Sequence, residues 1–195
     1  MTGPVRRLAG YGLAVRLPDR WEGRIYQRAN SVPAAPAGPP SAVPATASVS
    51  PAAGSSAQAA GSSVLAAQSV ARWQDERSHP VLHLANFALP GSRGDFGTGA
   101  VERMGSGHVF IAVLQFGADC LGSALYAPQG FPRLAARDFN PNGLQRRVAG
   151  QAGFQHFCTV ADRPLCLYVV LGAHRQAAAL CPEINDVIER IEVSQ

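Results

Sequence analysis

Residues 154–172 read FQHFCTVADRPLCLYVVLG and contain the strongest fold signal in the chain. Two apolar runs, 154–160 and 165–171, flank a short polar break, and this pattern predicts a β-hairpin. Because both faces of each run carry mostly apolar side chains, we expect central strands of a sheet that is covered on both sides. The rest of the chain is expected to supply the neighbouring strands and the covers.

The position of the turn determines which hairpin residues face each other. With Asp162 at its centre, Cys158 and Cys166 lie directly opposite one another, and His156 shares their face. This register would allow a cross-strand disulfide or a metal site, and the sequence leaves the pairing of the two thiols open. Structural zinc sites usually use close pairs such as CxxC, which the chain lacks. We therefore expect buried thiols in a reducing compartment, with no metal and no cofactor.

Further elements follow from shorter patterns. Alternating or continuous apolar runs predict strands at 11–17, 21–28, 81–89 and 107–117. Residues 130–142 are bounded by prolines and are expected to be extended, whereas 121–126 could be a strand or coil. A helix is expected at 176–190, with Pro182 in its first turn, where proline is tolerated. Its buried face is marked by four residues at helical spacing, Ile184, Val187, Ile188 and Ile191. A short strand is expected to follow at 191–193.

The chain is expected to form one α+β domain over residues 1–195, a mainly antiparallel β-sheet flanked by helices in an α/β/α sandwich. Residues 29–71 contain no charged side chain and consist mainly of Ala, Pro, Ser and Gly. We expect an insertion at 30–60 that is disordered, and a short helix within 62–77. Because residues 1–28 are too few to bury a core, they should pack on the later part of the chain. The alternative is a tether that docks these residues on another subunit.

Composition excludes several classes of function. All 17 basic residues are arginine, so the chain cannot perform lysine-dependent chemistry such as that of P-loop proteins, protein kinases or Schiff-base enzymes. The net charge is +4, but the arginines are scattered, which argues against nucleic-acid binding. No apolar run is long enough to cross a membrane, and we expect a cytoplasmic protein.

Two weak chemical patterns remain. The glycines of 91–107 could form an anion-binding nest, although a turn-rich loop explains them equally well. For a thiol enzyme, Cys120 is the candidate nucleophile, with His79, His83 or His108 as its base. Nothing in the sequence orients such a pair, so whether the chain is an enzyme stays undecided, with a non-catalytic role favoured.

The predicted function is a non-enzymatic accessory or protein-interaction module that binds a partner protein. Aromatic and charged side chains in loops suit recognition, and the expected contact surface combines 90–107 with 118–142. Its candidate binding residues are Asp95, Phe96, Arg103, Tyr126, Phe131 and Phe139. The alternatives are a small hydrolase or thiol enzyme and a subunit of a larger homomeric assembly.

A resemblance adds to this interpretation. Residues 11–21, YGLAVRLPDRW, resemble the start of the PsbP/Mog1-like superfamily, in which a strand leads into Pro-x-x-Trp and a second strand. The apolar hairpin at 154–171, the helix after it and the Ile-Glu-Val tail are also similar to that pattern. The resemblance implies an antiparallel sheet sandwiched by helices and a role in binding or stabilising partner proteins. It implies no catalytic residues.

Overall fold

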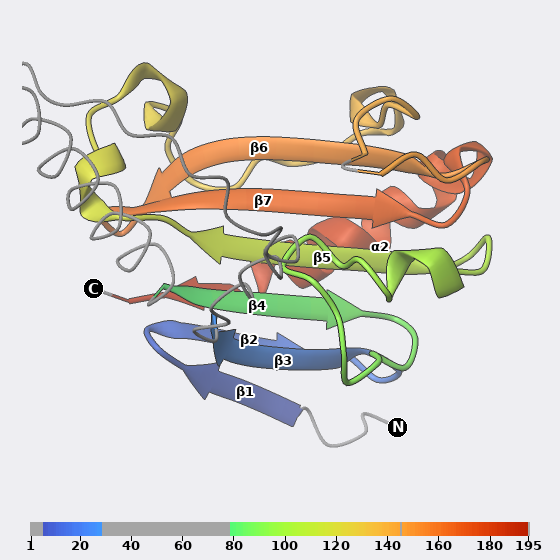
Figure 1. Cartoon of the computed structure of the whole chain (residues 1–195), viewed down its shortest axis with the longest axis horizontal. Helices are drawn as coiled ribbons and strands as arrows, with labels where there is room; N and C mark the ends of the chain where they lie inside the picture. The colour runs from blue at the N-terminus through green and yellow to red at the C-terminus, as the bar shows by residue number, and fades with distance from the viewer. Residues whose placement is uncertain (1–5, 29–78, 145, 195) are drawn as a thin grey trace, which may run out of the picture. The chain divides into compact units, whose positions relative to one another are not determined.

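The computed structural model describes residues 6–28, 79–144 and 146–194. Residues 1–28 and 78–195 belong to one compact unit, and its described part contains two antiparallel sheets (Figure 1). The five-stranded sheet has the order β3 (Glu22–Gln27), β4 (Pro80–Ala85), β5 (Val109–Gln115), β7 (Arg163–Leu171) and β6 (Ala152–Val160). The three-stranded sheet has the order β1 (Arg6–Gly10), β2 (Leu13–Leu17) and β8 (Ile191–Val193). The expected α+β class with antiparallel pairing is confirmed.

The hairpin of β6 and β7 is present, but its predicted register is wrong by one residue. Val160 pairs with Arg163, so the turn contains only Ala161 and Asp162. Both have positive φ, 49° and 58°, as in the two-residue turns that match the twist of a hairpin. Because a shift of one residue moves side chains to the other face, Cys158 and Cys166 lie on opposite faces of the sheet.

One face of the five-stranded sheet carries the larger core. The helix α2 (Ala177–Glu189) covers this face together with the three-stranded sheet. Trp21 donates a hydrogen bond from Nε1 to Glu183 Oε1 over 2.7 Å, which ties the start of β3 to the helix. Ile184 and Val187 are fully buried, as their spacing predicted. The tail strand expected at 191–193 is β8, which pairs with β2.

The opposite face is covered by a loop in the part of the chain that the structure describes. Residues 86–108 pass over it and contain one 3-10 turn, η1 (Val101–Arg103). Phe96 packs edge-on against Tyr168, with ring centroids 5.3 Å apart. The described residues therefore show one α-helix, on one face, where helices on both faces were expected. The helix expected at 62–77 and the insertion expected at 30–60 lie outside the described residues.

The N-terminal region begins its ordered structure earlier than the sequence suggested. Residues 1–9 carry no strong pattern, yet β1 pairs with β2 across a turn at Tyr11 and Gly12, which have φ of 53° and 76°. β3 pairs with β4 of the same chain, so Gln27 and Pro80, which flank segment 29–78, lie opposite each other.

The helix α2 also begins earlier than expected. It starts at Ala177, so Pro182 lies inside the helix and not in its first turn. The three alanines at 177–179 have the highest helix propensity of any residue type, and they add a turn before the proline. Proline at this position removes one backbone hydrogen bond and crowds the carbonyl of Ala178.

The region 118–142 closes the β6 edge of the five-stranded sheet. It contains three 3-10 turns, η2 (Ala118–Cys120), η3 (Ala124–Tyr126) and η4 (Ala136–Asp138), and η4 interrupts the stretch 130–142 that was expected to be extended. Thr159 N donates to Pro128 O over 2.8 Å, and Gly153 and Asn140 exchange two backbone hydrogen bonds. Both ends of the β6 edge are therefore bonded, which protects it from other strands.

Candidate functional site

The six candidate binding residues do not form one site. Phe131 and Phe139 pack with the core on the helix face, whereas Phe96 and Tyr126 belong to the opposite side of the sheet. Arg103 is exposed on η1. The expectation of exposed aromatics is wrong for Tyr126 and Phe139, which are 5% and 3% exposed.

These aromatic side chains are buried because the 118–142 region uses them as anchors. Tyr126 meets Phe157 edge-on, with centroids 5.5 Å apart, and its carbonyl accepts a hydrogen bond from Thr159 Oγ1 over 2.8 Å. The exposed large apolar side chains of the region are Leu121 and Leu125, at 37% and 55%. Proline-rich context therefore did not indicate which side chains face solvent.

Asp95 belongs to a polar cluster that the sequence did not reveal. The cluster consists of Tyr26, Arg28, His83, Arg93 and Asp95. Arg28 Nε lies 2.9 Å from Asp95 Oδ2, and the Tyr26 hydroxyl donates to Asp95 Oδ1 over 3.2 Å. The one available signal was the spacing of polar residues in β3, since side chains at alternate positions of a strand share a face.

His83 is the centre of this cluster and is fully buried. Its Nδ1 accepts a hydrogen bond from Arg93 Nε over 2.7 Å, so its proton must lie on Nε2. Nε2 lies 2.7 Å from the backbone oxygen of Asp95, which can only accept. The pKa of His83 is lowered to about 4, mainly by burial; the hydrogen bond to the Asp95 carbonyl opposes this shift and the cation of Arg93 adds to it. The imidazole is therefore neutral at physiological pH, with both nitrogens occupied.

The cluster acts as a clamp on the 90–97 loop. Besides holding His83, Arg93 donates from Nη1 to the carbonyl of Pro90 over 2.8 Å, and its guanidinium lies over the Tyr26 ring. Burial raises the pKa of Tyr26, and the carboxylate of Asp95 raises it further, so the phenol stays protonated. Gly97 completes the close approach, because its φ is 82° and a Cβ would lie 2.5 Å from the Phe110 ring.

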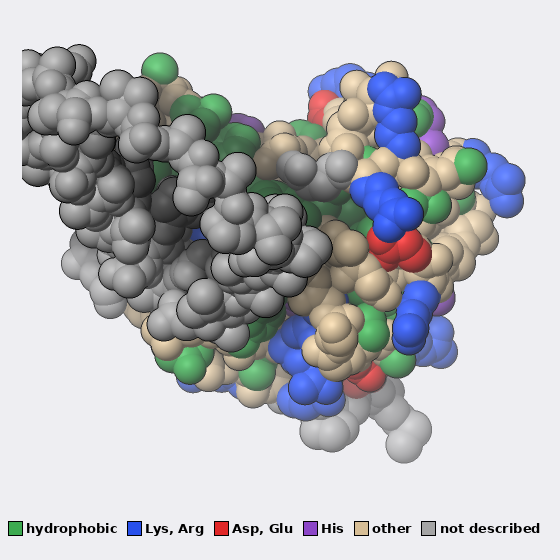
Figure 2. Space-filling model, in the orientation of Figure 1, with side chains coloured by type: hydrophobic (Ala, Val, Ile, Leu, Met, Phe, Trp, Pro, Cys, Tyr) green, Lys and Arg blue, Asp and Glu red, His purple; other side chains and the backbone are tan. Residues whose placement is uncertain are grey.

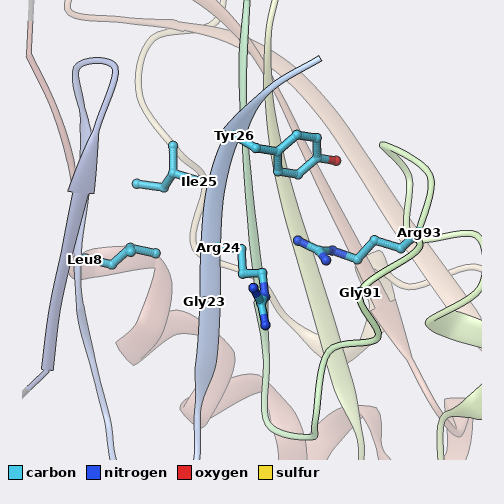
Figure 3. Close-up of a pocket in the computed structure, with 7 residues that line it drawn as sticks. All are labelled: Leu8, Gly23, Arg24, Ile25, Tyr26, Gly91 and Arg93. Carbon is cyan, nitrogen blue, oxygen red and sulfur yellow. The ribbon is translucent and has the colours of Figure 1, made fainter. Parts of the chain in front are cut away.

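The clamped loop borders a hollow at the edge of the sheet. The hollow has a volume of about 520 Å³ and is lined by Leu8, Gly23, Arg24, Ile25, Tyr26, Gly91 and Arg93. Figure 3 shows Arg24, Tyr26 and Arg93 on one side of β3 and Leu8 and Ile25 on the other. Arg24 is exposed, and no carboxylate is among the described residues that line the hollow.

A second hollow lies at the turn before β3, with a volume of about 570 Å³. Its charges are mixed, because Arg6 and Arg20 are accompanied by Asp19 and Glu22. Elsewhere, arginines lie in separate groups over the visible described face (Figure 2). The hollow beside β3 is therefore distinguished by its uniform positive charge, not by its size.

Neither His83 nor His108 is placed to act as a base for Cys120. His83 is occupied, and His108 precedes β5 while Cys120 follows it, a separation of about 20 Å or more for a strand of this length. His79 lies beside Gln115. Cys166 does not share a face with His156 and Cys158, and the described residues contain no group of three or more His, Cys, Asp or Glu side chains that could hold a metal ion.

Comparisons with models of protein families, with curated proteins and with solved structures find no match to the chain. The fold and the hollow therefore define an α+β protein with a clamped loop beside a basic sheet edge. Across the described ranges, no helix is long and apolar enough to cross a membrane.

Proposed function

We propose that the chain is a non-catalytic accessory module that binds a partner protein at the β3 edge and the adjoining 90–97 loop. One observation carries this proposal. The β6 edge of the five-stranded sheet is bonded at both ends, whereas β3 pairs only with β4 among the described strands. Its other edge opens onto the basic hollow.

The clamp supports this proposal because it fixes the loop before a partner arrives. A surface that is already ordered loses less conformational entropy on binding than a mobile one. Arg93 and Asp95 hold the loop through buried or half-buried contacts with His83 and Arg28. The resemblance of residues 11–21 to a superfamily of partner-binding proteins also favours an accessory role and remains a prediction. The buried free thiols of Cys158, Cys166 and Cys181 favour the cytoplasmic location that we propose.

The test is affinity capture from the native cell with quantified stoichiometry, using the wild type and Arg24→Glu. Arg24 is exposed, and we expect its charge reversal to release a partner that the wild type retains near one to one. Arg137→Glu is the matched control, since Arg137 is an exposed arginine on η4, away from the hollow. Deleting residues 90–107 would be uninformative, because Ala100 and Val101 within that range are buried.

Recovery of the wild-type bait alone would contradict the proposal. Equal retention of the partner by Arg24→Glu and Arg137→Glu would move the contact to another surface, such as the exposed Leu121 and Leu125. Recovery of further copies of the same chain would favour a homomeric assembly.

A further inference from the structure

The backbone of β3 presents hydrogen-bonding groups to the hollow at alternate residues. Asn86 N donates to Val109 O, and Leu84 pairs with Ile111, so even-numbered residues of β4 bond to β5. In an antiparallel ladder the groups of successive residues point to opposite edges. His83 and Ala85 therefore bond to Arg24 and Glu22, and the N–H and C=O groups of Gly23, Ile25 and Gln27 point outward.

Backbone groups alternate in the same way at the β6 edge of the sheet, which agrees with the outward direction assigned to the groups of β3. There, Gly153 and Thr159 of β6 are odd-numbered and bond outward to the 118–142 region. The 118–142 region thus shows how this fold satisfies an outward-facing edge. At β3, the described residues supply no strand in the corresponding position.

The walls of the hollow differ in character. On the helix side, Leu8 and Ile25 present apolar surface, and on the loop side Arg24 and Arg93 present cations (Figure 3). Successive side chains of a strand point to opposite faces. A strand lying along β3 would therefore place every second side chain against the apolar wall and the others against the arginines.

We propose that the β3 edge binds an extended acidic segment of a partner protein, which adds to the sheet as a sixth, antiparallel strand. This inference rests on the proposed function and specifies its partner. The segment alternates apolar residues, which face Ile25, with carboxylates, which face Arg24 and Arg93. Backbone hydrogen bonds give affinity in this binding mode, and the alternate side chains give specificity.

Charge favours a partner protein as the occupant of the β3 edge over a second copy of this chain and over the chain's own residues. Pairing β3 with β3 of a second copy in a continuous sheet would bring Arg24 and Arg93 of both copies onto one face. The carboxylates on that face are already engaged, because Glu22 accepts a hydrogen bond from Leu89 N and Asp95 pairs with Arg28. Residues 29–71 contain no charged side chain, so they cannot supply the acidic groups. Asp75 and Glu76 are adjacent in sequence, so a strand would point one of them at the apolar wall. Only a segment that carries Asp or Glu complements both walls.

The test uses a short synthetic peptide of alternating valine and glutamate, capped at both ends and labelled for fluorescence anisotropy. In the antiparallel register the residue opposite Ile25 shares its face, so the valines donate their N–H groups to β3. Methylation of the valine nitrogens should reduce affinity by more than about tenfold, whereas methylation of the glutamate nitrogens should leave it nearly unchanged. Affinity should also fall with added salt.

Two variants test the protein side. Ile25→Pro removes an outward N–H, and proline is tolerated on an edge strand when that group faces away from the ladder. Ile25→Val is its matched control, and we expect only the proline variant to lose the peptide. Arg24→Glu should weaken the valine–glutamate peptide and strengthen a valine–lysine peptide, a reversal that a merely unfolded variant cannot show.

The proposal is overturned if both methylated peptides bind as well as the parent, or if Arg24→Glu leaves the preference for glutamate unchanged. Recovery of a second copy of this chain on the β3 edge would also overturn it. Failure here is distinct from failure of the proposed function. A native partner that Arg24→Glu releases, but that Ile25→Pro and the peptides do not affect, would retain the module and reject strand addition.

Discussion

At the scale of the residue, His83 shows how a buried polar side chain can hold a loop in place. Its imidazole accepts a hydrogen bond from Arg93 Nε at Nδ1 and donates one from Nε2 to the backbone oxygen of Asp95. Leaving such groups unpaired in the interior costs about 1–3 kcal/mol each. The three residues therefore depend on each other, and the 90–97 loop is fixed by their mutual satisfaction.

This burial predicts a pH dependence of stability. The pKa of His83 is lowered to about 4 in the folded protein, against about 6.5 in the unfolded chain. Below pH 6.5 the unfolded state takes up a proton that the folded state does not, so the free energy of unfolding falls until about pH 4. The expected loss from this group is about 3 kcal/mol.

His83→Gln supplies the control, because a neutral amide can accept from Arg93 and donate to Asp95 without titrating. Urea unfolding of both proteins at pH 7 and pH 4.5 isolates the contribution, since the other ionisable groups are common to both. An identical pH dependence in the two proteins would show that the imidazole titrates normally.

At the scale of the element, α2 contains a proline in its interior, whereas the sequence pattern predicted this proline in the first turn. The helix begins at Ala177, so Pro182 is in its interior. Replacing Pro182 by alanine restores a backbone hydrogen bond and relieves crowding at Ala178, and should raise the free energy of unfolding by about 2 kcal/mol. Thermal or denaturant unfolding measures this change.

The same substitution distinguishes the two helix boundaries. A helix that began at Pro182 would gain almost nothing, because the first turn tolerates proline. Pro141→Ala is the control, since Pro141 is an exposed turn residue and should change stability by less than about 0.5 kcal/mol. Equal effects of the two substitutions would favour the later start.

At the scale of the whole molecule, the sequence predicted the positions of the strands better than their register and their long-range contacts. The hairpin, the buried β5 and the helical spacing in α2 are local signals, and the structure confirms them. The register depended on φ at Ala161, a residue type that seldom adopts positive φ, so nothing local indicated it. The clamp joins β3, β4 and the 90–97 loop, and pairing across such distances leaves little trace in neighbouring residues.

The pairing of β3 with β4 makes a prediction about the intervening residues. Gln27 and Pro80 lie opposite each other, so a short connection can join the two strands. Replacing residues 32–75 with a glycine–serine linker about fivefold shorter should keep unfolding cooperative. It should also lower the entropic free-energy cost of closing the loop by about 1 kcal/mol, which raises the free energy of unfolding. Denaturant unfolding and amide exchange in β3 and β4 measure this, and a loss of cooperativity would show that the replaced residues belong to the fold.

The pairing of β2 with β8 governs the order in which the protein can assemble during synthesis. Leu13 lies opposite Val193, so β2 has to wait for a strand that is synthesised some 180 residues later. At ribosomal rates of 5–20 residues per second, that delay is roughly 10–40 s. Throughout it, the unpaired edge of β2 is open to other nascent chains. Chaperone dependence during translation, which a ribosome-profiling experiment would detect, is the expected consequence of this one short strand.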